Sequence, residues 1–226
     1  VLASNPRDTE ALVNQAELFL VQGQVDAARR NYERAIALNP RRKEAYYNLG
    51  RLHLQAGDLD RAERSVQQSL AVDPGYKEAY MLLGSLRVRR KDFAGAAREF
   101  ERAVALDTTY APARVNLGAA LLEQGNYTRA ISILQATLRQ SPSSYAWVNL
   151  GEAERRTGQV EAAERSFREA LRLDPKLERA KRELGLLLAV RPGAEAEARQ
   201  LLEALPPASA PDPDVEAALA RLRRRR

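Results

Sequence analysis

Few side chains in this chain have the chemistry of a catalytic or metal-binding group. His53 is the only histidine, and none of the 226 residues is a cysteine. Cysteine nucleophiles, disulfides and thiolate metal sites are therefore excluded, and a transition-metal site would need carboxylates alone. The sequence contains no phosphate-binding glycine loop, nucleophile elbow or His-Glu zinc motif. We therefore expect no enzymatic activity and no cofactor, and we interpret His53 as a structural residue.

A set of asparagines offers a different chemistry. They recur at Asn14, Asn48, Asn116 and Asn149, which are 34, 68 and 33 residues apart. An asparagine side chain carries both a donor and an acceptor, so a row of them could pair with the backbone of an extended peptide without reading its sequence. The alternative is that these side chains only satisfy neighbouring helices. The sequence leaves both interpretations open.

The elements that must position these residues repeat along the chain. A Leu-Gly pair occurs at 49–50, 83–84, 117–118, 150–151 and 184–185, with steps of 34, 34, 33 and 34 residues. A period of this size indicates an array of one small unit, which usually presents a binding surface. In residues 9–42 the apolar positions follow helical spacing on both sides of Gly23, and Pro40 ends the second run. Each repeat is therefore predicted to be a helical hairpin.

The pattern resembles the tetratricopeptide repeat family, whose signature has large, small and proline residues at set positions. Residues 144–177 match it nearly throughout, with Trp147, Leu150, Gly151, Ala163, Phe167, Ala170 and Pro175. The resemblance covers roughly nine tenths of the chain. It implies an all-α fold, a right-handed superhelical solenoid of antiparallel helical hairpins closed by a C-terminal capping helix.

Six repeats are expected, at 9–42, 43–76, 77–110, 111–143, 144–177 and 178–205, with the sixth degenerate. The departures from the family pattern are Gln15 in place of leucine, Lys91 in place of the turn glycine and Thr108 in place of the terminal proline. Residues 1–8 align with the end of a preceding repeat. They indicate either a domain excised from a longer repeat protein, which we favour, or a mature chain cut after a leader.

The C-terminal part of the chain follows a different pattern. Residues 206–212 are interpreted as a Pro-rich linker, and residues 213–226 as the capping helix with a basic tail. Asp212 and Pro213 are typical of a helix start. The tail is either a solvated helix end, which we favour, or an anchor for acidic lipid headgroups or nucleic acid. Its four arginines are Arg223, Arg224, Arg225 and Arg226.

In the tetratricopeptide family the first helices of the repeats line a concave groove, so the resemblance implies that binding occurs there. Position 5 of the first five repeats is apolar in this chain, and position 6 carries the asparagines in four of them. The expected peptide-binding residues are Val13, Asn14, Tyr47, Asn48, Arg51, Met81, Arg89, Val115, Asn116, Val148, Asn149 and Glu152.

The charge pattern argues against nucleic acid as the partner. The chain has a formal net charge of +6 and a pI of about 9.8. The predicted groove is nearly neutral, so we expect the excess of positive charge on the convex face and the tail, often paired along the second helices as in Glu161–Arg165 and Glu164–Arg168. A nucleic-acid binder would gather basic and aromatic residues along one stripe.

The family's known carboxylate clamp uses Lys and Arg at positions 2, 5 and 6 of set repeats. The first three repeats of this chain carry glutamate at position 2 and an apolar residue at position 5, so the clamp is absent there. In the sixth repeat, Arg179 and Arg182 could form a partial imitation of it.

These observations favour a non-catalytic protein–protein interaction scaffold that binds an extended or helical peptide segment in the groove. The alternatives are a targeting module of a larger enzyme, such as a glycosyltransferase or protease, and a bacterial envelope assembly factor. The second is similar to the outer-membrane lipoproteins that help pilus secretins assemble. Only five of the 36 basic residues are lysines, a bias common in GC-rich bacterial genomes. The sequence shows no signal peptide or transmembrane segment and leaves the cytoplasm and the bacterial envelope as possible compartments.

Overall fold

The computed structural model describes residues 7–206 and 212–224. Thirteen helices and no strands occur in these ranges, so the predicted all-α repeat array is confirmed. The chain divides into two compact units, which we call the N-terminal unit (Val1–Ala113) and the C-terminal unit (Arg114–Arg226). The right-handed coiling of the array stays a prediction.

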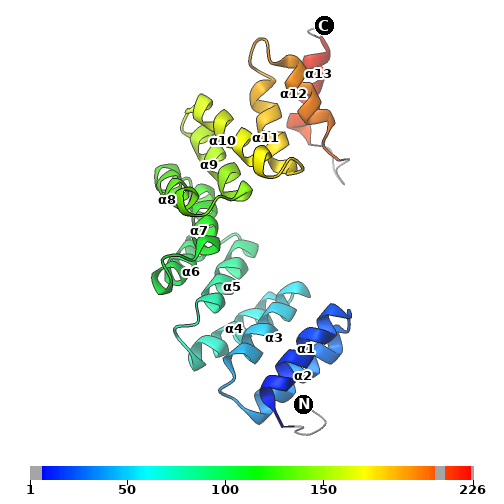
Figure 1. Cartoon of the computed structure of the whole chain (residues 1–226), viewed down its shortest axis with the longest axis vertical. Coiled ribbons are helices and arrows are strands. Elements are labelled where there is room, and N and C mark those ends of the chain that lie inside the picture. Colours follow the sequence, from blue (N-terminus) through cyan, green and yellow to red (C-terminus); the bar gives the residue numbers. More distant parts are fainter. Residues whose placement is uncertain (1–6, 207–211, 225–226) are drawn as a thin grey trace. The chain divides into compact units, whose positions relative to one another are not determined.

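The helices are joined by short loops and are labelled in Figure 1. In the N-terminal unit they are α1 (Thr9–Val21), α2 (Val25–Leu38), α3 (Lys43–Gln55), α4 (Leu59–Val72), α5 (Lys77–Arg89) and α6 (Phe93–Leu106). The α7 helix (Ala111–Glu123) begins at the end of this unit and continues into the next one. The C-terminal unit also contains α8 (Tyr127–Gln140), α9 (Ser144–Arg156), α10 (Val160–Leu173), α11 (Glu178–Leu188), α12 (Glu195–Glu203) and α13 (Pro213–Arg224).

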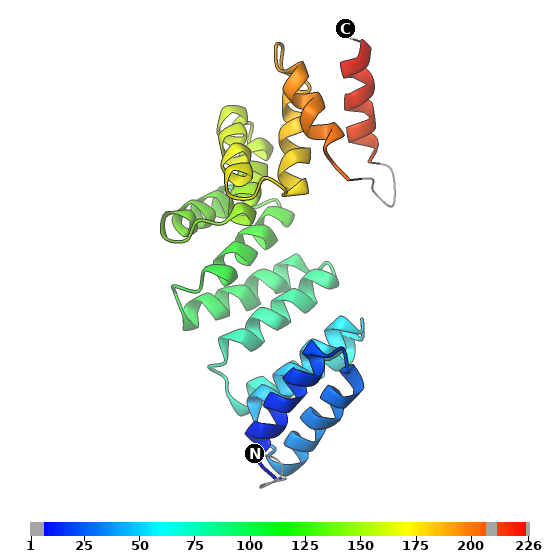
Figure 2. The same ribbon diagram turned by 45° about the vertical axis from the view of Figure 1, so that its right-hand side comes forward.

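Consecutive helices form antiparallel pairs, which Figure 2 shows clearly for α1 with α2 and for α3 with α4. The first helix of each pair begins at the first residue of a predicted repeat, at Thr9, Lys43, Lys77, Ala111, Ser144 and Glu178. The glycine of each Leu-Gly pair explains the close approach. A Cβ atom on Gly84 would lie 2.3 Å from Cε1 of Phe100, and one on Gly151 would lie 2.7 Å from Cε1 of Phe167. Glycine therefore lets the second helix pack directly against the backbone of the first.

The turn inside each hairpin requires a residue with positive φ. Gly57 and Gly158, for example, have φ of 78° and 77°. Lys91 occupies the same place between α5 and α6 with φ of 59°, a conformation that costs an L-residue with a side chain roughly 1–2 kcal/mol. Lys91 therefore replaces the turn glycine without changing the positive-φ conformation of the turn.

The C-terminal helix α13 packs against α11 and α12, as expected for a capping helix. Oδ1 of Asp212 accepts hydrogen bonds from the backbone N–H of Asp214 at 3.0 Å and of Val215 at 3.3 Å, which starts the helix at Pro213. Leu222 is completely buried in the core of this unit.

Several predictions concern residues at the ends of the described ranges. Arg223 and Arg224 are exposed, which agrees with a solvated helix end. The interpretations of residues 1–6, of most of the 206–212 linker and of Arg225 and Arg226 fall outside the described residues.

Candidate peptide-binding surface

The inner face of the N-terminal unit carries the predicted groove residues of the first three repeats. We use the term inner face for the surface formed by positions 2, 5, 6, 9, 12 and 13 of the first helices. Tyr47 and Met81 are half-buried there, and Arg51 and Arg89 are exposed. Val13 is buried in the core shared by α1, α2 and α3, so it is a packing residue and not part of the open surface.

Three tyrosines gather on this side of the N-terminal unit, and we call them the tyrosine cluster: Tyr47, Tyr76 and Tyr110. The rings of Tyr47 and Tyr76 meet edge to face, with centroids 5.3 Å apart and an interplanar angle of 68°. Tyr110 is close enough to Tyr47 to raise the pKa of its phenol. The guanidinium of Arg51 lies 5.9 Å from the centroid of the Tyr47 ring.

A repeated ion pair positions two of these tyrosines. The ammonium group of Lys43 forms an ion pair with Asp73 and lies 4.7 Å from the centroid of the Tyr76 ring. One repeat later, Lys77 and Asp107 are 2.6 Å apart (Nζ to Oδ2), and Lys77 lies 4.9 Å from the centroid of the Tyr110 ring. Each lysine therefore links the start of a first helix to the loop that follows the second helix, and holds a tyrosine beside it.

Glu78 is a charged neighbour of all three tyrosines and also of Lys43 and Lys77, whose pKa values its negative charge raises. Burial is the main cause that raises the pKa of each phenol, and the negative charge of Glu78 raises all three pKa values further. Arg51 acts in the opposite direction on Tyr47 and Tyr76. Within the described residues, Glu78 has no ion-pair partner and the three phenol hydroxyls have no hydrogen-bond partner. The cluster thus combines half-buried aromatic surface with uncommitted polar atoms.

The asparagine row does not form a continuous open ladder. Asn48 is 5% exposed, donates to Oε1 of Glu17 at 3.3 Å and accepts from Arg51 at 3.3 Å. Asn149 is 4% exposed and accepts from Arg179 at 2.9 Å. For these two asparagines the structure favours the alternative interpretation, in which the side chain satisfies a neighbouring helix. Asn14 is exposed and Asn116 is half-buried.

In the C-terminal unit the predicted inner-face arginines are held by carboxylates. Arg179 pairs with Glu152, which also lies 3.8 Å from Arg156. Arg182 contacts Asp212 at 2.5 Å. Glu152 on α9 neutralises Arg179, and Asp212, just before α13, neutralises Arg182. The partial clamp suggested for these two arginines therefore has no free cation.

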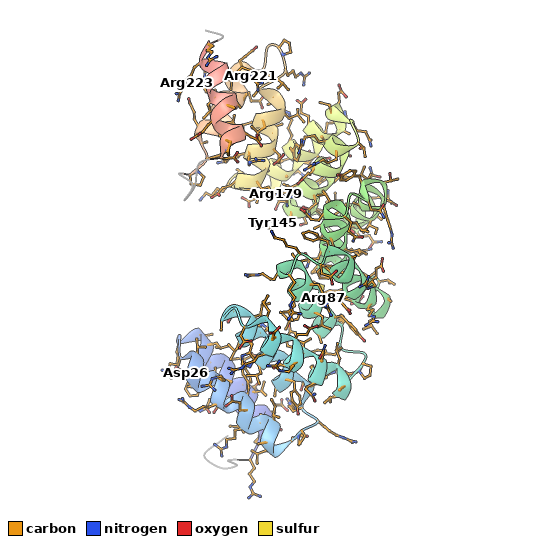
Figure 3. The ribbon with its side chains drawn as sticks, turned by 180° about the vertical axis from the view of Figure 1, so that it is seen from behind. Asp26, Arg87, Tyr145, Arg179, Arg221 and Arg223 are labelled. Carbon is orange, nitrogen blue, oxygen red and sulfur yellow. The ribbon has the colours of Figure 1, made fainter. Side chains whose placement is uncertain are left out.

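The other residues predicted to line the groove in this unit differ in how far they are buried. Val148 is buried, and Val115 is half-buried. Tyr145, labelled with Arg179 in Figure 3, is 61% exposed and belongs to position 2 of its repeat. Tyr145 is not among the predicted groove residues, although position 2 falls on the inner face.

Sequence reasoning also missed Tyr76 and Tyr110, because position 34 of a repeat lies outside the first helix. A signal for them does exist in the chain. Each tyrosine follows an aspartate by three residues and a lysine by 33, and the two sets, Lys43–Asp73–Tyr76 and Lys77–Asp107–Tyr110, are 34 residues apart. The recurrence of Asp, Tyr and Lys predicts the shared geometry that the structure shows.

Other chemistry is not gathered into a site in the described part of the chain. His53 is half-buried, and burial is the main cause that lowers its pKa. No group of three or more His, Cys, Asp or Glu residues that could hold a metal ion occurs among the described residues. Within the same ranges, no helix is long and apolar enough to cross a membrane.

Comparisons with known protein families agree with the repeat pattern. A family model described as the cilia and flagella-associated protein 70 C-terminal domain matches residues 75–205, which is more than half of the chain. A second model, described as a tetratricopeptide repeat, matches residues 19–86. A comparison with curated protein sequences gives no significant match.

Solved structures show the same fold. The chain is similar to a chain of the APC/C hetero-tetramer Cut9–Hcn1, with 17% identity and a TM-score of 0.81; the match covers 98% of this chain but only 44% of that one. The MamA protein is 27% identical with a TM-score of 0.64, over 74% of this chain and 92% of MamA. YrrB, described as a TPR protein with an unusual peptide-binding site, is 22% identical with a TM-score of 0.66, over 80% of this chain and 94% of YrrB.

Proposed function

The chain belongs to the tetratricopeptide-repeat superfamily, and from that premise we propose that it binds a peptide segment of another protein on the inner face of its N-terminal unit. Proteins of this superfamily are generally non-catalytic interaction scaffolds. The observation that carries the proposal is the tyrosine cluster, in which three half-buried phenols have a common charged neighbour, Glu78, that forms no ion pair within the described residues.

The chemistry of the cluster defines the kind of segment that fits it. Half-buried rings and the Met81 side chain favour an apolar anchor, since burial of a large apolar side chain contributes about 1.5–3 kcal/mol. Glu78 favours a basic residue or a backbone N–H beside that anchor. The phenol hydroxyls can donate to or accept from peptide groups. The proposed ligand is therefore a short segment with one large apolar side chain next to a basic residue.

Other inner-face residues have secondary places in the proposal. Asn14 is the exposed member of the asparagine row, and we propose that it bonds the peptide backbone in the way suggested for the whole row. In the C-terminal unit, Asn116 and Tyr145 are the inner-face residues proposed to contact a peptide, separately from the site in the N-terminal unit. The similarity to YrrB supports a peptide as the class of ligand.

The test is a comparison of charge reversals in affinity purification from the source organism. Glu78→Lys replaces the central carboxylate, and Asp26→Lys is the matched control on α2, outside the cluster. We expect Glu78→Lys to remove a protein that the wild type and Asp26→Lys both retain. A peptide from that protein should then bind Glu78→Lys at least about tenfold more weakly in calorimetry. Equal retention by all three proteins would contradict the proposal.

A second pair of variants separates the hydroxyl groups from the rings. Tyr76→Phe and Tyr110→Phe keep the aromatic surface and remove only the phenol oxygen. If the hydroxyls bond the peptide, each change should weaken binding by about tenfold or less, since a net hydrogen bond contributes about 1 kcal/mol. Unchanged affinity in both variants would leave the rings, and not the hydroxyls, as the contact.

A further inference from the structure

The C-terminal unit has a cleft of about 620 Å³ that the proposed inner-face site does not use. It lies between the second helices α8 and α10, over α9, which packs against both and can be found in Figure 1. Its volume is within the range of about 300–1,000 Å³ typical of ligand pockets. The lining residues that carry the argument are Leu138, Arg139, Trp147, Leu150, Glu154 and Arg165.

The floor of the cleft is apolar. Leu138 comes from α8, and Trp147 and Leu150 come from one face of α9 at helical spacing. Trp147 is half-buried, whereas both leucines are buried. Part of the indole therefore faces the cleft instead of the core. A large apolar side chain entering here would cover the exposed part of the tryptophan ring.

The rim of the cleft carries two uncommitted cations. Arg168 also lines the cleft, but carboxylates of Glu164 at 3.1 Å and Glu197 at 2.5 Å neutralise it. Arg139 and Arg165 have no ion pair within the described residues. The sequence had predicted a pair between Glu161 and Arg165. The structure does not form it, whereas the companion pair of Glu164 and Arg168 is present.

A buried carboxyl group completes the cleft. Glu154 is 5% exposed, and its Oε2 accepts a hydrogen bond from the Ser166 hydroxyl at 2.7 Å. Burial is the main cause that raises its pKa, while the Ser166 bond and the nearby charge of Arg165 lower it. Its second oxygen, Oε1, has no partner within the described part of the chain, and no cation lies within ion-pair distance. This oxygen is not among the enclosed polar atoms that lack a partner, so it can be reached from the cleft, and a donor from a ligand would replace water there.

We propose that this cleft is a second docking site, which binds an acidic linear peptide segment through one large apolar side chain. The apolar side chain packs on Trp147, Leu138 and Leu150. Carboxylates beside it pair with Arg139 and Arg165 on the rim. A backbone N–H of the segment donates to Oε1 of Glu154. The site would allow the chain to hold two different partners, because the inner-face cluster favours a basic segment and the cleft favours an acidic one.

The same groups argue against two other anionic partners. A phosphate group entering the cleft would approach the Glu154 carboxyl, which offers an acceptor and no donor when ionised. A membrane surface could reach the rim arginines but would leave the apolar floor and Glu154 unused. A peptide supplies the apolar side chain, the carboxylates and the N–H donor together.

Trp147 provides a direct test, because it is the only tryptophan in the chain. The probe is the peptide acetyl-Ser-Glu-Asp-Leu-Asp-Glu-Ser-amide, titrated into the whole protein while tryptophan emission is recorded. We expect a saturable change in emission. The same peptide with alanine in place of leucine should bind about tenfold more weakly, and one with lysines in place of the acidic residues should cause no saturable change.

Variants of the protein then locate the binding. Arg139→Glu and Arg165→Glu should each weaken the peptide by about tenfold. Arg98→Glu, an exposed arginine on α6, is the matched charge reversal and should leave the affinity unchanged. Glu78→Lys should also leave it unchanged, so that failure here and failure of the inner-face proposal are distinguishable.

Three results would overturn the proposal. The first is the absence of a saturable emission change up to millimolar peptide. The second is equal weakening by Arg98→Glu and by the rim variants, which would indicate general charge attraction. The third is a response to vesicles containing phosphatidylserine, or to single-stranded RNA, without a response to the peptide.

Discussion

Gly84→Ala tests whether the Leu-Gly pairs set the helix spacing that builds the inner face. A Cβ atom at this position would lie 2.3, 2.6 and 2.7 Å from three ring carbons of Phe100. The shortest of these distances is far below the 3.4 Å at which ordinary van der Waals contact begins. Phe100 is 2% exposed, so its ring has little room to move away.

The expected magnitude follows from two opposing effects. Overpacking of a close-packed core costs about 1–3 kcal/mol, and more when the obstructing group cannot shift. Alanine in place of a helical glycine returns about 1 kcal/mol of helix stability. We therefore expect Gly84→Ala to lower the free energy of unfolding by about 1–2 kcal/mol. Gly50→Ala is the matched control, because its Cβ would approach only one atom closer than 3.0 Å, a methyl group of Val66.

Urea unfolding followed by circular dichroism measures both variants. The order of stability should be wild type, then Gly50→Ala, then Gly84→Ala. Trp147 lies in the C-terminal unit, and repeats interact mainly with their neighbours, so the transition seen by its emission should shift less than the helical signal. An unchanged midpoint for Gly84→Ala, or a larger loss for Gly50→Ala, would refute the explanation of the Leu-Gly spacing.

Three further predictions concern the turn, the core and the acid response. Lys91→Gly should raise the free energy of unfolding by about 1 kcal/mol, because glycine adopts positive φ without strain; a lower urea midpoint would contradict this. Burial raises the pKa of Tyr32 to about 12, so its contribution to stability is complete below about pH 10 and is lost as the pH rises toward 12. The buried hydroxyl of Tyr32 has no hydrogen-bond partner, so Tyr32→Phe should not destabilise the protein at neutral pH. The same variant should unfold at a higher alkaline pH than the wild type, and circular dichroism measures both effects. The side-chain hydrogen bond from Lys77 is the main cause that lowers the pKa of Asp107 to about 2. Asp107→Asn should therefore be less stable than the wild type at neutral pH, and this difference in stability should disappear as the pH falls from about 4 to 2. A difference in stability that does not depend on pH would contradict the role given to the Lys77–Asp107 pair.

The repeat architecture could be predicted because several independent signals share one period. Leu-Gly pairs, turn glycines and prolines recur together, and the first helices begin at the expected residues, such as Thr9 and Lys43. Even the exception at Lys91 left the turn in place, because packing between neighbouring helices determines the hairpin more strongly than one residue's preference.

The details of the candidate site could be predicted only in part. Helical spacing assigned Tyr47 and Met81 to the predicted groove, and both side chains are half-buried. It could not show that Asn48 and Asn149 are buried and bonded, because that depends on Glu17 and Arg179 in neighbouring repeats. A pattern within one repeat cannot reveal hydrogen-bond partners that lie about 30 residues apart in the sequence.

The cleft in the C-terminal unit shows the same limit of sequence reasoning. The family pattern explained Trp147 as a core residue, and the spacing of Glu161 and Arg165 suggested an ion pair. In the structure Trp147 is half-buried at the floor of a cleft, and Arg165 lines its rim. Both outcomes depend on the space between α8 and α10, which belong to different repeats.

The central claim, that a partner peptide binds at the tyrosine cluster of the inner face, is tested most directly by site-specific photo-crosslinking. The photoreactive amino acid p-benzoylphenylalanine is incorporated in place of Met81 on the inner face or, as the control, in place of Arg98 on α6. Irradiation with the bound partner is followed by mass spectrometry of the crosslinked peptide. We predict a crosslink from position 81 and none from position 98. A crosslink from position 98 alone, in a complex of undiminished affinity, would contradict the account.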